Sequence, residues 1–81
     1  MFLNLLLTKY SIQNIQIDMT NREKEVLKYA AQGMDNYEIA NYLHVSIHTI
    51  KVHMKNIFQK LKVQDRTEAV VKAIKYSIID I

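Results

Sequence analysis

Between residues 46 and 62 the chain reads SIHTIKVHMKNIFQKLK, a run in which apolar residues recur at helical spacing. Ser46 suits the start of a helix, because its hydroxyl can accept a hydrogen bond from a free backbone amide in the first turn. On a helical wheel the apolar residues form one stripe, the usual mark of a buried face. The stripe consists of Ile47, Ile50, Met54, Ile57, Phe58 and Leu61. We therefore expect a helix from about Ile47 to Lys62 with its back against a core.

The opposite arc of this helix is polar and basic. Lys51 and Lys55 lie one turn apart on it, and the run has four lysines and no acid. An apolar back with a basic front is the pattern of a helix that enters the major groove of DNA, which is about 12 Å wide. A solvated helix face has a similar composition, so the residues alone leave both interpretations open. The arc consists of His48, Lys51, Val52, Lys55, Asn56 and Gln59.

Two further helix starts lie upstream. Thr20 and Glu23 have the spacing of a capping box, in which the two side chains satisfy each other's backbone amides. Gly33 predicts the end of that helix, because glycine adopts the left-handed backbone without steric penalty. Asp35 and Glu38 repeat the box and predict a short helix that ends before a turn at residues 44–45.

A fourth helix is predicted downstream, capped by Asp65 and starting near Thr67. Val71 and Ile78 lie beside its apolar face and widen it. The face itself consists of Ala69, Val70, Ala73, Ile74 and Ser77. With one glycine and no proline in the chain, these signals predict an all-α fold of four helices.

Length and composition limit the class of protein. With 81 residues the chain has room for one modest core, which argues against a large enzyme cleft. The absence of cysteine is typical of proteins from reducing compartments, so we expect a cytoplasmic location. A bilayer-spanning helix needs about 20 apolar residues, and no stretch reaches that length, so we expect a soluble protein without membrane contact. The net charge of +3 is too small to establish nucleic-acid binding by itself.

Residues 1–18 are rich in Phe, Leu and Ile, but the spacing of these residues is uneven. Their apolar content is high for a free solvated tail. We expect an N-terminal arm or short helix that packs on the domain of residues 19–81 or on a second chain.

Neither a metal site nor a catalytic site is expected. His48 and His53 are five residues apart and diverge on a helix, and His44 falls in the turn, so the three histidines share no ligand geometry. The capping spacing accounts for Asp35 and Glu38 without a catalytic role. We expect no cofactor and no small-molecule substrate.

Four blocks of the sequence together resemble the LuxR-type (GerE-like) DNA-binding domain of bacterial transcription regulators. They are MTNREKEVL at 19–27, GMDNYEIA at 33–40, VSIHTIKVH at 45–53 and NIFQKL at 56–61. The resemblance extends from about Met19 to Tyr76. It implies a four-helix domain whose second and third helices form a helix-turn-helix and whose fourth helix supports dimerisation.

The segment KVHMK at 51–55 resembles the recognition helices of nitrate-responsive two-component regulators. The resemblance implies that Lys51, Val52 and Lys55 face base edges. A second group is expected to contact phosphate or to brace the fold. It comprises Tyr37, Ser46, His48, Thr49, His53, Asn56 and Gln59.

Two positions depart from the family pattern. Lys62 stands where relatives usually have glycine, so either the helix continues or a left-handed lysine costs about 1 kcal/mol. Tyr37 replaces a residue that is usually basic, which exchanges a charged phosphate contact for a weaker one or for a neutral hydroxyl contact.

The sequence thus predicts a non-enzymatic transcription regulator that binds double-stranded DNA. Val71, Lys75 and Ile78 are the candidate seam of a homodimer, since paired domains gain by reading two half-sites. RNA polymerase is a further expected partner. The alternatives are a promoter-reading domain of the sigma-factor type and an interaction module whose basic helix meets an acidic protein.

Overall fold

The computed structural model describes residues 17–80, and within them it contains four helices and no strand. The helices are α2 (Asn21–Ala31), α3 (Asn36–Leu43), α4 (Ile47–Leu61) and α5 (Arg66–Lys75). The predicted all-α fold of four helices is confirmed. The predicted arm or short helix at residues 1–18 lies outside the described residues except for Ile17 and Asp18, and Ile17 packs against the core.

The predicted N-caps form as expected. The Thr20 hydroxyl accepts from the Glu23 amide at 3.1 Å, and a Glu23 carboxylate oxygen accepts from the Thr20 amide at 2.9 Å. Asp35 and Glu38 make the same reciprocal pair, at 2.8 and 3.0 Å. Asp65 caps α5, which begins at Arg66, one residue before the predicted start.

All four helices end in the same way. At each end one amide donates to the carbonyl five residues back and the preceding amide donates to the carbonyl three residues back, as in Ile78 to Ala73 and Ser77 to Ile74. This ending places one residue in the left-handed region. Glycine occupies that position only after α2, and the four residues are Gly33, His44, Lys62 and Ser77.

Two expected helix ends need correction for this reason. The helix from Ile47 was expected to reach about Lys62, but it ends at Leu61; Lys62 has a φ of 56°, so of the two alternatives stated for it the left-handed lysine is confirmed. Ser77 and Ile78 were expected on the faces of the fourth helix, but α5 ends at Lys75 and Ser77 has a φ of 58°. In both places a hydrogen-bonded turn reverses the direction of the chain, although neither turn contains a glycine.

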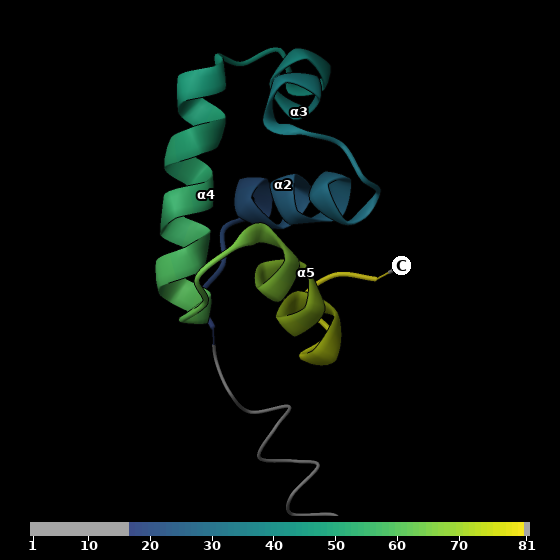
Figure 1. Ribbon diagram of the computed structural model, residues 1–81, viewed down its shortest axis with the longest axis vertical. Helices are drawn as coiled ribbons and strands as arrows, with labels where there is room; N and C mark the ends of the chain where they lie inside the picture. Colours follow the sequence, from purple (N-terminus) through teal and green to yellow (C-terminus); the bar gives the residue numbers. More distant parts are fainter. Residues whose placement is uncertain (1–16, 81) are drawn as a thin grey trace, which may run out of the picture.

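The helices pack around one core (Figure 1). In this view α4 stands along one edge, α3 lies near its N-terminal end, and α2 and α5 lie on the same side of α4 as α3. The largest fully buried side chains are Val26, Leu27, Ile39, Ile50, Ile57 and Leu61. One long side of α4 is thereby left free of other helices. None of the helices in residues 17–80 has the length and hydropathy of a membrane span.

Candidate nucleic-acid interface

The apolar stripe of α4 faces the core as predicted. Ile50 and Ile57 have no exposed surface, and Met54 and Leu61 are also buried. Phe58 is half-buried and packs against the core from the margin of the stripe, where Ile47 is also half-buried. The stripe therefore fixes the rotation of α4 about its axis and determines which residues face outward.

The predicted base-contacting residues lie together on the exposed side of α4. Lys51 and Lys55 are exposed, and Val52 between them is 43% exposed, which is high for a valine. His48 and Gln59 are exposed on the same side. We call these five residues the outward arc of α4.

The predicted supporting residues divide by exposure. His53 and Asn56 are half-buried, at the margins of the outward arc. The Ser46 hydroxyl accepts from the Thr49 amide at 3.0 Å and lies 2.9 Å from the Thr49 hydroxyl. Ser46 and Thr49 therefore satisfy each other at the start of α4, as caps do.

Lys60, near the end of α4, forms an ion pair with a residue of α2. Its ammonium lies 2.7 Å from a carboxylate oxygen of Glu23, which is only 3% exposed. Burial raises the pKa of Glu23, but the Lys60 hydrogen bond, the Thr20 hydrogen bonds and the Lys60 charge together hold that pKa below its usual 4.5. The pair ties the start of α2 to the end of α4.

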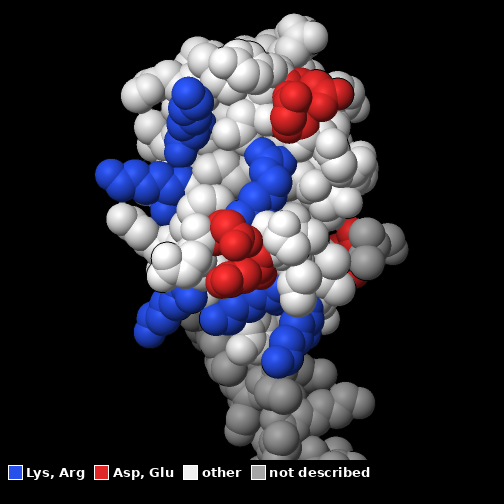
Figure 2. All heavy atoms as spheres, in the orientation of Figure 1, with Lys and Arg blue, Asp and Glu red and all other residues white. Residues whose placement is uncertain are grey.

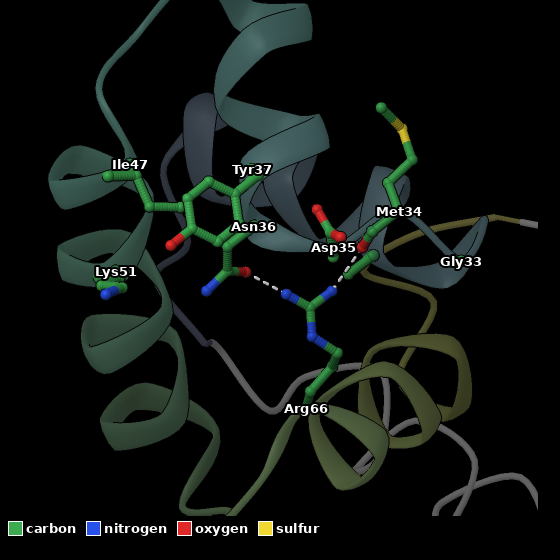
Figure 3. A pocket seen from close by; sticks show the side chains of 9 residues that line it. Gly33, Met34, Asp35, Asn36, Tyr37, Ile47, Lys51 and Arg66 are labelled. Carbon is green, nitrogen blue, oxygen red and sulfur yellow. Dashed lines mark hydrogen bonds between the residues drawn. The ribbon is translucent and has the colours of Figure 1, made fainter.

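A hollow lies beside the outward arc, between the start of α3 and the N-terminal half of α4. Tyr37, predicted as a phosphate-contacting residue, lines it and is 70% exposed. Lys51 lines the same hollow from α4, and Arg66 lines it from α5 (Figure 3). The hollow therefore joins a base-contacting candidate, a phosphate-contacting candidate and a cation from a third helix.

Sequence reasoning missed Arg66. Its Nη1 donates to the Met34 carbonyl oxygen at 2.7 Å, and its Nη2 donates to the Asn36 Oδ1 atom (Figure 3). These partners are 32 and 30 residues away in the chain, so no local spacing pattern could have revealed them.

The predicted dimer residues are only partly brought together. Val71 is 59% exposed on α5, and Lys75 is exposed one turn further on. Ile78 lies beyond the end of α5, where it is half-buried and packs against the core. The exposed face of α5 is therefore shorter than the sequence predicted.

Basic side chains border the edge of the molecule that α4 forms. On the face drawn in Figure 2, Lys and Arg side chains lie along that edge and also at the centre and lower end, while the acidic side chains lie away from that edge. The sequence agrees, because α4 itself contains no Asp or Glu. Within residues 17–80, no three His, Cys, Asp or Glu side chains gather in a metal-binding arrangement.

Comparison with known proteins agrees with this geometry. The family model described as bacterial regulatory proteins, luxR family, matches residues 18–73. The response regulator protein VraR of Staphylococcus aureus and that of Staphylococcus epidermidis are each 48% identical to the chain over 61 residues. That alignment covers 75% of this chain and 29% of each relative, so the chain corresponds to less than a third of their length.

Two solved structures have the same fold. The response regulator ChrA of a heme-sensing two-component system superposes with a TM-score of 0.76 at 33% identity, over 94% of this chain and 37% of ChrA. The transcription factor GerE superposes with a TM-score of 0.73 at 26% identity, over 76% of this chain and 92% of GerE. The resemblance stated from the sequence is confirmed: this chain belongs to the luxR family of bacterial regulatory proteins, whose helix-turn-helix domains bind DNA and regulate transcription rather than catalyse reactions.

Proposed function

We propose that this domain reads a specific sequence of double-stranded DNA by inserting the outward arc of α4 into the major groove. The observation that carries the proposal is the exposure, on one side of α4, of two lysines with a valine between them. These residues are Lys51, Val52 and Lys55. The buried stripe on the opposite side of α4 fixes their direction. An α-helix with its side chains is about 10–12 Å across, which matches the width of the groove.

The chemistry of these side chains suits base edges. A lysine ammonium donates hydrogen bonds and can meet the O6 and N7 acceptors of guanine, and a valine can pack on the methyl group of thymine. Lys51 and Lys55 lie one helical turn apart, so they reach neighbouring positions along the groove.

Contacts to the phosphate backbone would orient the domain without specifying sequence. Tyr37 has the exposure for such a contact through its hydroxyl, and His48 and Gln59 have it on α4. Ser46, Thr49, His53 and Asn56 support the position of α4 through caps and packing at its margins.

We also propose that two copies of the domain pair through α5 and bind two half-sites. The exposed Val71 and the neighbouring Lys75 would form the seam, with Ile78 at its edge. In this arrangement the domain acts as the effector part of a response regulator and changes promoter use by contacting RNA polymerase. Its similarity to VraR and ChrA supports this role.

Selection from random duplexes, followed by titration of the selected duplex at several salt concentrations, tests the proposal. We expect one enriched motif and an affinity that falls steeply with salt. The logarithm of the binding constant should fall with the logarithm of the salt concentration with a slope of about 0.9 per neutralised phosphate. A paired motif would support two half-sites. If no motif were enriched and no duplex were bound at low salt, the DNA-reading function would be contradicted and the protein-interaction module would be favoured. If promoter elements were enriched only when polymerase is added, a sigma-type role would be favoured.

A further inference from the structure

Arg66 occupies an unusual place between three helices. It is the first residue of α5, it is half-buried, and its guanidinium reaches the start of α3. One nitrogen donates to the Met34 carbonyl just before α3, and another donates to the side chain of Asn36, the first residue of α3 (Figure 3). The planar guanidinium of α5 therefore joins two acceptors at the start of α3, one just before the helix and one in its first residue.

The start of α3 is held from two directions. Met34, just before the helix, packs half-buried against the core, and its amide donates to the Tyr29 carbonyl at the end of α2 at 3.1 Å. Within the helix, Ile39 and Ala40 are buried and fix its centre against the core, while Tyr37 and Glu38 are exposed. The hydrogen bonds of Arg66 add the contact that ties this N-terminal end to α5.

The same guanidinium lies next to the outward arc of α4. Two hollows along this flank of α4 share Asn36, Lys51 and Arg66 in their walls. The second hollow also includes Lys55. A shift of the first residues of α3 would therefore change the surroundings of both Lys51 and Lys55.

From these contacts we propose that Arg66 is a positioning residue for DNA reading, which locks the start of α3 to α5 and thereby sets how the outward arc of α4 meets the groove. This inference rests on the proposed DNA-reading function. It rests on the two guanidinium donors that are directed to Met34 and Asn36, and it assigns Arg66 no contact with DNA. Its effect should therefore be on discrimination between sequences and not on phosphate contacts.

The test compares Arg66→Lys with the unchanged chain. Lysine keeps the charge but carries a single ammonium, which cannot hold both acceptors in the planar geometry of a guanidinium. The affinity for the selected duplex and for a scrambled duplex is measured at several salt concentrations, at a temperature where circular dichroism finds both proteins folded. We expect the ratio of the two affinities to fall by roughly 2- to 30-fold. The salt slope should not change.

Three results would overturn the inference. An unchanged affinity ratio in folded Arg66→Lys, with only a lower melting temperature, would make Arg66 a structural residue alone. An equal loss of affinity for both duplexes would make it a direct phosphate ligand, because phosphate contacts carry no sequence information. If Arg66→Lys does not fold, Asn36→Ala removes one of the acceptors instead, and an unchanged ratio in that variant would also overturn the inference.

Lys72→Met is the matched control. Lys72 also lies on α5, and it donates to the Leu61 carbonyl at 2.7 Å, at the end of α4 away from α3. Its loss should lower the melting temperature without changing the affinity ratio. An unchanged chain that prefers no duplex would refute the proposed function and the inference with it, whereas equal preferences in the unchanged chain and Arg66→Lys would refute the inference alone.

Discussion

The two sides of α4 have the same backbone and opposite surroundings. On one side Ile50 and Ile57 have no exposed surface and contact residues of the other helices. On the other side Lys51, Val52 and Lys55 are exposed. Stability and recognition therefore depend on separate arcs of one helix, so a substitution on the buried arc should affect stability and one on the exposed arc should affect binding.

The largest expected effect is on the buried side. Ile57→Ala removes a fully buried side chain and should lower the free energy of unfolding by roughly 2–5 kcal/mol, through lost apolar burial and the cavity left behind. Urea denaturation measures the change. Val52→Ala is the control on the exposed side and should remain within about 0.5 kcal/mol of the unchanged chain. Equal losses from the two variants would contradict the separation.

The second prediction concerns the exposed side. Lys51→Ala and Lys55→Ala should each weaken binding to the selected duplex by about 1–3 kcal/mol, while the free energy of unfolding changes little. Fluorescence anisotropy at fixed salt measures the affinity. Lys24→Ala removes an exposed lysine from α2 and serves as the charge control. If all three variants bound equally well, the reading role of the outward arc would be wrong.

The ion pair between Glu23 and Lys60 gives a third prediction. Glu23→Gln keeps the shape of the side chain but loses the charge that faces Lys60, so stability near neutral pH should fall by about 1–3 kcal/mol. The pKa of Glu23 is lowered on folding, so its contribution is fully present above pH 4.5 and is lost as pH falls through the folded-state pKa. The unchanged chain should therefore lose its advantage over Glu23→Gln as pH falls below 4.5, as measured by urea denaturation. An advantage that stays constant with pH would refute this role of the carboxylate.

The smallest effect is expected where α4 ends. Lys62 adopts the left-handed backbone, so Lys62→Gly should stabilise the fold by about 0.5–1 kcal/mol by removing the strain of the Cβ atom. Thermal unfolding measures the shift. Lys62→Ala loses the same charge but keeps the Cβ atom, and a gain as large as that of Lys62→Gly would show that charge and not backbone strain is responsible.

Local signals were sufficient to predict much of this fold. The four N-caps could be predicted because a cap needs only partners within one turn. They are Thr20, Asp35, Ser46 and Asp65. The apolar stripe of α4 likewise follows from a repeat within one segment, and it correctly predicted that Lys51 and its neighbours face outward.

Two kinds of feature could not be predicted in this way. His44, Lys62 and Ser77 take the left-handed position at helix ends, where the usual signal is glycine, so two helices ended earlier than expected. The contacts of Lys60 with Glu23 and of Arg66 with Asn36 join residues 37 and 30 positions apart. Such pairs depend on how the helices pack, and the residue spacing within either segment does not predict that packing.

The proposed entry of the outward arc of α4 into the major groove can be tested by NMR spectroscopy. The measurement is of nuclear Overhauser effects between the methyl groups of Val52 and protons of the selected duplex. The proposed geometry predicts contacts from Val52 to base or thymine methyl protons in the major groove, and none from the methyl groups of Val71 on α5. Contacts from Val71 to the duplex, with the Val52 methyl groups remaining free of DNA protons, would contradict it.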